Sequence, residues 1–356
     1  MRSNKLLIIF SSLLTLIFLE LLFNFIIFPK NDYNYKNRYL IFSEGKIFKN
    51  IDNFFTYEPN KELIASNYYF NNGEFNLVYK HKIYTNNLGL VQKTDIDSEL
   101  PSILFLGDSF TEGQGAESWI NQFNGKYKNY QIINGGFLGT GFQQFNLIDN
   151  YLSKNDIQKV FVLFIGDDLR RDIFQFNNQQ LDCLNNHKLC NGNENFYGFP
   201  LSKKKPQNFL TNLRKKQFNK NEKKNIDLKK LRRNLKTSIS ELYIFKIPIN
   251  FLKSHLYKSK NEKILKNFKA INSLVEKYDN DIFFIHLHMK EEILNKKRGY
   301  ESIYVREHIK SLTKNYFTCT FDKDISNFYN FDHHPNVQGY ENLYQCVLNI
   351  FVKEKI

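Results

Sequence analysis

From about residue 100 onward, short apolar segments alternate with longer amphipathic ones, and this alternation limits the possible folds more than any other feature of the chain. Apolar segments with the length of buried strands lie at 102–106, 130–134, 159–165, 282–288 and 316–320. Helical patterns lie near 117–127, 142–154, 262–277 and 301–312. Short buried strands that alternate with helices predict an α/β fold in which helices cover both faces of a parallel, five-stranded sheet.

Glycine and polar residues follow the three best-marked strands, as Gly-Asp-Ser at 107–109, Gly-Gly at 135–136 and Gly-Asp-Asp at 166–168. Ligands of open α/β sheets bind at the carboxyl ends of the strands, so we expect the functional site there. Ser109 lies in the first of these turns, where the N–H groups of a starting helix can face an anion. A serine hydroxyl needs a base to act as a nucleophile, and without one this serine is an ordinary helix N-cap.

A second polar cluster, DHHPN at 332–336, follows the last predicted strand. An aspartate two residues before a histidine can orient the imidazole ring and stabilise the imidazolium. Because this loop is expected at the same edge of the sheet as Ser109, the sequence predicts a base for the serine hydroxyl.

The sequence resembles the SGNH/GDSL hydrolase family of serine esterases and acyl hydrolases over about residues 85–350. The segments that carry the resemblance, in the family's order, are YTNNLGL at 84–90, ILFLGDSFTEG at 103–113, NGGFLGTGFQQ at 134–144, IGDDLRRD at 165–172 and DHHPNVQG at 332–339. The resemblance implies a flavodoxin-like three-layer α/β/α fold that works without a cofactor or metal.

The resemblance also implies roles for individual residues. Ser109 would be the nucleophile, and Asp332 and His334 would complete the catalytic triad. His334 is preferred to His333 because the family's histidine directly precedes the Pro-Asn pair. His334 would take the Ser109 proton, and Ser109 would attack an ester carbonyl to form an acyl-enzyme. Water or an acceptor hydroxyl would then take the acyl group. The N–H groups of Ser109 and Gly139 would hold the oxyanion, with a third donor from the Gly-Asp-Asp motif.

That third donor is where this chain departs from the family. Asp167 occupies the position of the family's asparagine. A carboxylate cannot donate a hydrogen bond, and the loss of one oxyanion donor costs roughly 10²–10³ in rate. Three explanations are open. Asp167 is protonated and donates, or Arg170 or Arg171 neutralises or replaces it, or the protein binds its ligand with weak or lost catalysis.

Residues 6–28 form a mostly apolar run of 23 residues, which at about 1.5 Å per residue can span a bilayer core. Arg2 and Lys5 precede the run and favour a cytoplasmic N-terminus. No small-residue cleavage site follows it. We therefore predict an uncleaved signal anchor over 1–30, a single membrane pass and an extracytoplasmic, periplasmic catalytic domain.

The four cysteines fit an oxidising compartment. Cys183 and Cys190 lie close together in a polar stretch, and Cys319 and Cys346 flank the last motif. Two disulfides, 183–190 and 319–346, are possible, although four cysteines allow three pairings and can also remain free thiols. No Cys/His spacing resembles a zinc site.

Most of the net charge of +14 lies in one segment. Residues 203–236 contain fourteen Lys/Arg and two acidic residues, whereas the rest of the chain has 36 basic and 34 acidic residues. This segment belongs to a predicted helical insert at about 195–260 within a hydrolase-like domain over 96–356. It could contact an anionic lipid or glycan, or be a solvated helix pair. Nucleic acid is not an expected partner, because the predicted compartment lacks it.

Residues 31–95 are predicted to form an aromatic, polar lead-in with short strands and no chemistry. Compartment and resemblance together predict a membrane-anchored serine esterase that removes O-acyl groups, acetyl in particular, from a cell-surface glycan. An O-acyltransferase would use the same triad with a sugar hydroxyl as acceptor. The alternative from a different class is a binding or assembly protein that keeps the fold, which Asp167 would favour.

Overall fold

The computed structural model of the chain describes residues 11–12, 14–20, 38–44, 47–52, 54–71, 74–127, 129–173, 175–190, 194–196, 199–200, 211, 262–294, 299–320 and 324–354. Most of the predicted anchor at 6–28 and nearly all of the basic segment at 203–236 lie outside these ranges. The chain divides into two compact units, Met1–Asn34 with Lys215–Asn261 and Tyr35–Arg214 with Glu262–Ile356. In the first unit, residues 11–12 and 14–20 are helical. No helix in the described ranges is long and apolar enough to span a membrane.

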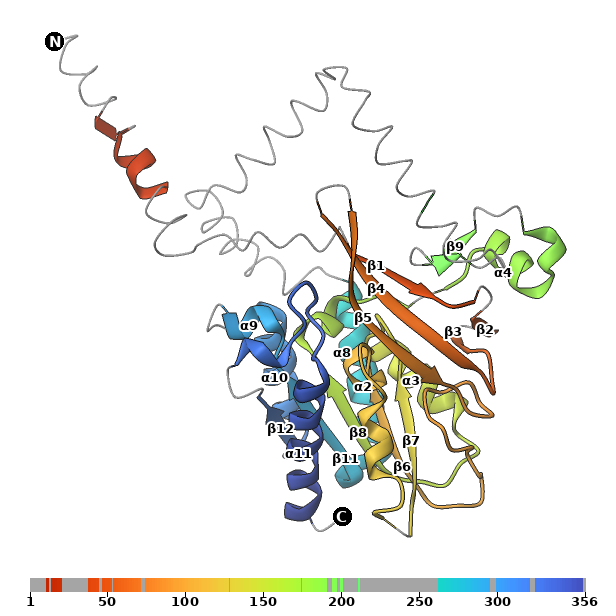
Figure 1. Ribbon diagram of the computed structural model, residues 1–356. Coiled ribbons are helices and arrows are strands. Elements are labelled where there is room, and N and C mark those ends of the chain that lie inside the picture. Colours follow the sequence, from red (N-terminus) through yellow and green to blue (C-terminus); the bar gives the residue numbers. More distant parts are fainter. Residues whose placement is uncertain are drawn as a thin grey trace. The chain divides into compact units, whose positions relative to one another are not determined.

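A parallel sheet of five strands lies at the centre of the second unit, as predicted (Figure 1). Its strands are β6 (Ser102–Gly107), β7 (Gln131–Gly136), β8 (Ile157–Phe164), β11 (Ile282–Leu287) and β12 (Tyr316–Cys319). The spatial order is β12-β11-β8-β6-β7, which is the flavodoxin-like order with its topological switch between β6 and β8. Open sheets of this order bind ligands at the carboxyl ends of the strands on either side of the switch.

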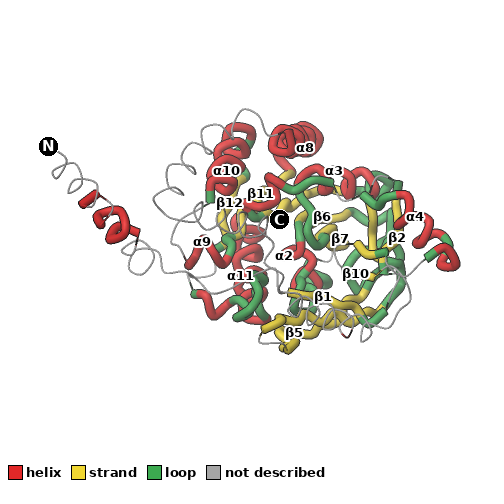
Figure 2. Tube along the Cα trace, turned by 90° about the horizontal axis from the view of Figure 1, so that it is seen from above, coloured by secondary structure: helices red, strands yellow, loops and turns green. Residues whose placement is uncertain are grey.

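Helices cover both faces of this sheet, so the unit has three layers (Figure 2). One face carries α3 (Phe142–Tyr151), α8 (Glu262–Tyr278) and α10 (Tyr300–Leu312), and the other carries α2 (Ser109–Glu112) and α11 (Val337–Lys353). Strand side chains point alternately to the two layers. Phe161 stacks on Phe351 of α11 with 4.4 Å between the ring centroids, whereas Phe164 lies 5.4 Å from Phe142 of α3.

Two helical segments differ from the predictions. Residues 117–127 contain only the 3₁₀ turn η3 (Trp119–Phe123). The Trp119 indole N–H donates to the Phe110 carbonyl at 2.9 Å and anchors this turn in the core. The long helix α11 is not among the predicted helices. It begins just after the 332–336 cluster, where Asn336 caps it by accepting the Gly339 N–H at 3.0 Å.

The lead-in segment forms a three-stranded antiparallel sheet in the order β1-β4-β5, rather than short strands alone. Its strands are β1 (Arg38–Phe42), β4 (Glu62–Asn71) and β5 (Glu74–Tyr84), of which the last two have 10 and 11 residues. Buried and less buried residues alternate along β4, as in a strand with one face on a core. A hairpin of β2 (Phe48–Ile51) and β3 (Phe54–Tyr57) completes this lobe.

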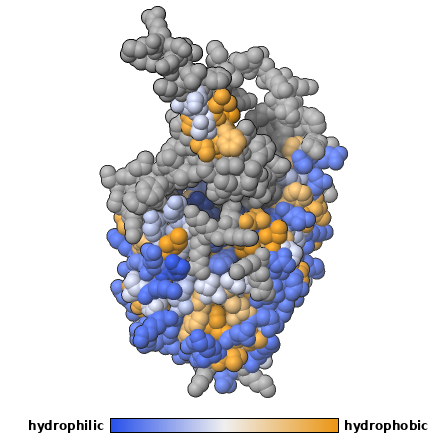
Figure 3. Space-filling model, turned by 90° about the vertical axis from the view of Figure 1, so that its left-hand side faces the viewer, coloured by the Kyte–Doolittle hydropathy of each residue, from blue (hydrophilic) through white to orange (hydrophobic). Residues whose placement is uncertain are grey.

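The remaining described elements are α4 (Asn178–Asn185), α9 (Lys290–Leu294), β9 (Asn195–Phe196), β10 (Phe199–Pro200) and the 3₁₀ turns η4 (Gly166–Arg170), η5 (His187–Leu189), η6 (Asp279–Asp281) and η7 (Ile325–Asn327). The cysteines form two disulfides, Cys183–Cys190 and Cys319–Cys346, and the second joins β12 to α11. On the face shown in Figure 3, hydrophilic residues predominate among the described ones, and hydrophobic residues form separate small groups.

Candidate active site

Ser109 lies at the turn between β6 and α2, at the carboxyl edge of the sheet. The Asp108 carboxylate caps the helix by accepting the Phe110 N–H at 2.9 Å, so Ser109 is the first helical residue. The helix packs closely on the end of β7, since a Cβ on Gly136 would lie 2.4 Å from the Glu112 nitrogen. The glycine at the end of β7 therefore permits this close approach.

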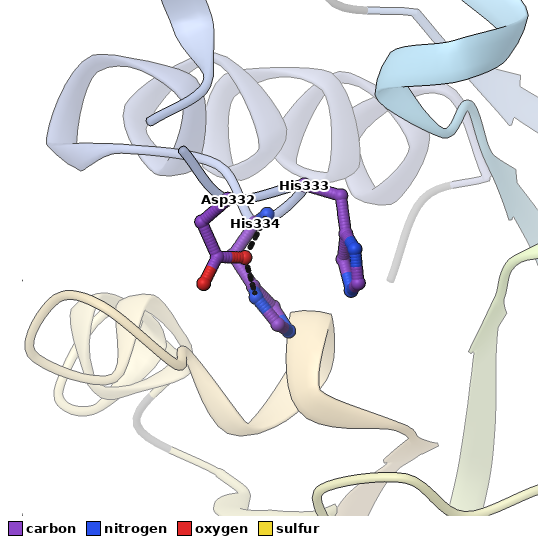
Figure 4. A group of neighbouring side chains, drawn as sticks. All are labelled: Asp332, His333 and His334. Carbon is purple, nitrogen blue, oxygen red and sulfur yellow. Dashed lines mark hydrogen bonds and ion pairs between the residues drawn. The ribbon is translucent and has the colours of Figure 1, made fainter. Parts of the chain in front are cut away.

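The structure brings Ser109, His334 and Asp332 into one chain of hydrogen bonds. Ser109 Oγ lies 2.8 Å from His334 Nε2, and His334 Nδ1 lies 2.5 Å from Asp332 Oδ1. The same Oδ1 accepts the backbone N–H of His334 at 3.0 Å. Figure 4 shows the Asp332 carboxylate turned toward His334, with the His333 ring to one side. A base that is held in this way between a carboxylate and a serine hydroxyl can deprotonate the serine.

Helix α9 and the segment that follows α2 hold the loop that carries Asp332. Lys290 Nζ donates to the backbone carbonyls of Tyr329, Asn330 and Asp332. The Tyr329 hydroxyl donates to the Gly115 carbonyl at 2.6 Å, on the segment that follows α2. The loop of the base and the turn of the nucleophile are thus joined although they lie far apart in the sequence.

Three residues of the lead-in sheet complete the surroundings of Asp332. Arg38 Nη1 donates to Oδ1 at 2.8 Å. Asn67 Nδ2 and the Tyr79 hydroxyl donate to Oδ2, the latter at 3.2 Å. Burial alone would raise the pKa of Asp332, but His334 and then Arg38 hold it well below its ordinary value through their positive charges and the His334 hydrogen bond.

The sequence predicts no functional residues in this lead-in segment, and prediction from the sequence therefore misses all three of these contacts to Asp332. The one local signal is that Asn67 is a polar residue at a buried position of a long strand. A buried amide needs a partner, but nothing in the neighbouring sequence indicates which one.

The loop after β7 contains Gly139, the expected oxyanion donor. Its φ of 72° is left-handed and suits glycine. The Phe137 N–H and the Thr140 hydroxyl donate to the Gly107 carbonyl, at 3.0 and 3.2 Å, and hold the loop against the turn of the nucleophile. The backbone N–H groups of Ser109 and Gly139 form no hydrogen bond with the described residues. Both can therefore donate to a ligand.

Asp167 forms an ion pair with Arg170, with 2.7 Å between Oδ2 and Nη2. The two side chains are 31% and 50% exposed. Of the three explanations for the aspartate at this position, this contact favours neutralisation by a neighbouring arginine. The structure assigns that contact to Arg170, whereas Arg171 has other partners.

Arg171 bridges the turn of the nucleophile and the loop after β7. Its Nη1 donates to Asp108 Oδ2 at 2.8 Å, to the Thr140 carbonyl at 2.9 Å and to Asp168 Oδ1 at 2.6 Å. Both carboxylates are fully buried. Burial, with the nearby Asp108 charge, raises the pKa of Asp168 well above its ordinary value, and the Arg171 charge opposes this shift. Arg171 is therefore the cation that makes these buried carboxylates tolerable.

A buried carboxyl group also braces the loop after β7. Glu112 accepts a hydrogen bond from the Tyr57 hydroxyl at 2.8 Å and another from the Leu138 N–H. The Tyr57 ring stacks on Phe137, with 5.4 Å between the centroids. Burial raises the pKa of Glu112 to about 8 despite these two hydrogen bonds, so the group is mostly protonated at neutral pH.

Asp332, His333 and His334 form the one group of side chains in the described part of the chain whose ligand atoms are close enough for a metal ion, within 4.8 Å of one another. Both ring nitrogens of His334 are already bonded, one to Asp332 and the other to Ser109. His334 therefore offers no uncommitted ring nitrogen to a metal ion, so this group does not fit a metal centre.

No protein-family model and no curated protein matches this sequence. Among solved structures, the chain is similar to a member of the lipolytic G-D-S-L family from Veillonella parvula, with 12% identity, a TM-score of 0.35 and coverage of 71% of this chain and 98% of that one.

Two carbohydrate-active enzymes are also similar. A family two carbohydrate esterase from Clostridium thermocellum, solved with cellohexaose, has 11% identity and a TM-score of 0.33 over 74% of this chain and 67% of that one. An acetyl xylan esterase from Butyrivibrio proteoclasticus has 11% identity and a TM-score of 0.30 over 74% and 65%. These likenesses are distant, so the functional interpretation rests on the side chains.

Proposed function

We propose that this protein is a serine esterase of the SGNH/GDSL type that cleaves O-acyl esters through Ser109, His334 and Asp332. The observation that carries the proposal is the chain of hydrogen bonds from Ser109 Oγ to His334 Nε2, at 2.8 Å, and from His334 Nδ1 to Asp332 Oδ1, at 2.5 Å. It lies at the carboxyl edge of a flavodoxin-like sheet, where the fold favours ligand binding.

The geometry supports a two-step reaction. His334 removes the hydroxyl proton as Ser109 Oγ bonds to the ester carbonyl carbon, and the Asp332 carboxylate stabilises the imidazolium. The N–H groups of Ser109 and Gly139 donate to the oxyanion. Collapse of this intermediate breaks the bond to the leaving alcohol, which takes the proton from His334. His334 then deprotonates a water that attacks the acyl carbonyl carbon. As the bond to Ser109 Oγ breaks, His334 returns the proton to Oγ and the carboxylic acid leaves.

The pair of Asp167 with Arg170 leaves two backbone donors for the oxyanion. We expect a slower enzyme than one with asparagine at this position, because the loss of one donor costs roughly 10²–10³ in rate. Neutralisation by Arg170 limits the electrostatic penalty of the carboxylate. Weak catalysis is therefore the expectation, rather than none.

The cellular setting is part of the same proposal. The apolar run at 6–28 supports a signal anchor and an extracytoplasmic site. This compartment and the family resemblance favour O-acyl groups on a cell-surface glycan as the substrate. The basic segment at 203–236 would suit an anionic lipid or glycan.

Hydrolysis of p-nitrophenyl acetate tests the proposal. The 356-residue chain is assayed in detergent beside Ser109→Ala, Asp167→Asn and, as a matched control, Ser311→Ala, which removes an exposed hydroxyl on α10. We expect activity in the parent and the control, loss of at least 10³-fold in Ser109→Ala, and a 10-fold or larger gain in kcat in Asp167→Asn.

The other outcomes separate the alternatives. A parent protein that does not hydrolyse p-nitrophenyl acetate, together with an Asp167→Asn variant that does, would favour a binding or assembly protein. A rate of p-nitrophenol release that increases when a sugar acceptor is added, with the acetyl group recovered on a sugar hydroxyl, would favour the O-acyltransferase. Activity that survives in Ser109→Ala would refute the serine mechanism.

A further inference from the structure

The triad carboxylate contacts nitrogen atoms of two side chains, Arg38 and His334, at once. Arg38, on the first strand of the lead-in sheet, lies 294 residues from Asp332 in the sequence, and its Nη1 donates to Asp332 Oδ1 at 2.8 Å. His334 Nδ1 bonds to the same oxygen atom at 2.5 Å. The Asp332 side chain is fully buried and that of Arg38 is 22% exposed, so little water screens this contact.

Sharing one oxygen brings the two donors close together. Because their distances to Oδ1 are 2.8 and 2.5 Å, Arg38 Nη1 and His334 Nδ1 are no more than about 5.3 Å apart. The guanidinium stabilises the carboxylate, but it repels a proton on the imidazole. The lead-in sheet thus acts on the base through the carboxylate that orients it.

We propose that Arg38 is a positioning residue that fixes the Asp332 carboxylate and keeps His334 unprotonated, and therefore available as a base, to lower pH. The proposal deepens the esterase function and rests on it. It also makes the lead-in sheet a part of the catalytic apparatus, because Asn67 and Tyr79 hold the second oxygen of the same carboxylate.

Other ionisable groups also face this pair and set the background against which Arg38 acts. They are Tyr79 and His81 of β5, Lys290 and Glu291 of α9, and Tyr329 and His333 of the triad loop. Burial, and then the His334 charge, lower the pKa of His81 to about 4, so it is neutral where an esterase would work. Lys290 donates to the backbone carbonyl of Asp332, whereas Arg38 places its positive charge directly on the Asp332 carboxylate.

The first test is the pH dependence of kcat/KM for p-nitrophenyl acetate. Arg38→Gln removes the charge, Arg38→Lys keeps it on a shorter side chain, and Lys82→Gln removes a charge from an exposed ion pair on the same sheet. Two unit charges about 5 Å apart at an effective dielectric of about 20 correspond to about two pH units. Partial exposure of Arg38 reduces this, and we expect the acidic limb to move upward by about one unit in Arg38→Gln.

The sizes of the acidic-limb shifts in the three variants test the role of Arg38. We expect a smaller upward shift in Arg38→Lys, none in Lys82→Gln, and an effect on kcat with little change in KM. If either Arg38 variant folds, as judged by its melting temperature, and its acidic limb is not shifted, the proposal is overturned. Arg38→Lys keeps the test open if the neutral variant does not fold.

A second measurement does not depend on turnover. The chain with ¹⁵N-labelled histidine and Ser109→Ala is titrated by NMR with Arg38 present or replaced by glutamine, and the His334 signal is identified by its absence in His334→Gln. We expect the titration midpoint to rise by about one pH unit without Arg38. An unchanged midpoint overturns the role of Arg38. An inactive parent would instead contradict the esterase proposal while this shift is still observed.

Discussion

Substitution of Arg171 by methionine removes the cation that lies between two buried carboxylates. Asp108 and Asp168 are both fully buried, and both accept from the same guanidinium nitrogen, at 2.8 and 2.6 Å. Breaking a buried ion pair by removal of one partner costs about 3–5 kcal/mol, because a charge remains without compensation. Asp168 can relieve part of this cost by taking up a proton. We therefore expect the free energy of unfolding to fall by about 3–4 kcal/mol at pH 7.

The sign of the pH dependence follows from Asp168. Burial and the Asp108 charge already raise its pKa in the folded protein, and the loss of Arg171 raises it further. A carboxyl group whose folded pKa exceeds its unfolded value destabilises the fold progressively as the pH rises between the two. The deficit of Arg171→Met should therefore be smaller at pH 5 than at pH 7.

Urea unfolding at both pH values measures these differences. Arg170→Met is the matched control, because Arg170 is the neighbouring arginine in a half-exposed ion pair with Asp167, and its loss should cost less than about 1 kcal/mol. Adding Asp168→Asn to Arg171→Met should recover about half of the deficit. Equal losses in the two methionine variants, or a deficit that does not change with pH, would refute this account of the buried cluster.

Two further predictions concern stability. Because burial raises the pKa of Glu112 to about 8, the folded protein should lose stability from about pH 4.5 to pH 8. Between pH 5 and 8.5, the free energy of unfolding of the parent, measured in urea, should fall by about 2–4 kcal/mol relative to that of Glu112→Gln. A difference between the two proteins that does not change with pH would contradict this. Serine at both Cys319 and Cys346 opens a link of 27 residues and should cost about 3.5 kcal/mol, against about 2 kcal/mol for Cys183 and Cys190 with a separation of 7. Thermal unfolding of the two double variants compares them, and equal losses would argue against the loop-entropy explanation.

The sequence alone predicts the central sheet well. Each of the five strands lies within two residues of its predicted bounds, because a buried strand in a parallel sheet is a short apolar run with glycine or polar residues at its end. Both signals are local, so neighbouring residues are enough to reveal them. The positions of Ser109 and the 332–336 cluster after strands place both at the ligand-binding edge for the same reason.

Local signals fail where partners come from distant parts of the chain. The sequence of the lead-in segment indicates no functional residues. In the structure, β1, β4 and β5 each supply one hydrogen bond to Asp332, from positions 253 to 294 residues away. The sequence does not distinguish the roles of the neighbouring arginines Arg170 and Arg171. In the fold, Arg170 pairs with Asp167, whereas Arg171 pairs with two buried carboxylates.

The sequence by itself thus determines the secondary structure of the sheet and the residue types at its edge, since these depend on local hydrophobicity and turn chemistry. The tertiary structure decides which charges are buried together, which carboxylate each arginine serves and how strongly the base is tuned. These properties depend on the distance between groups and on the water excluded from around them, and packing sets both.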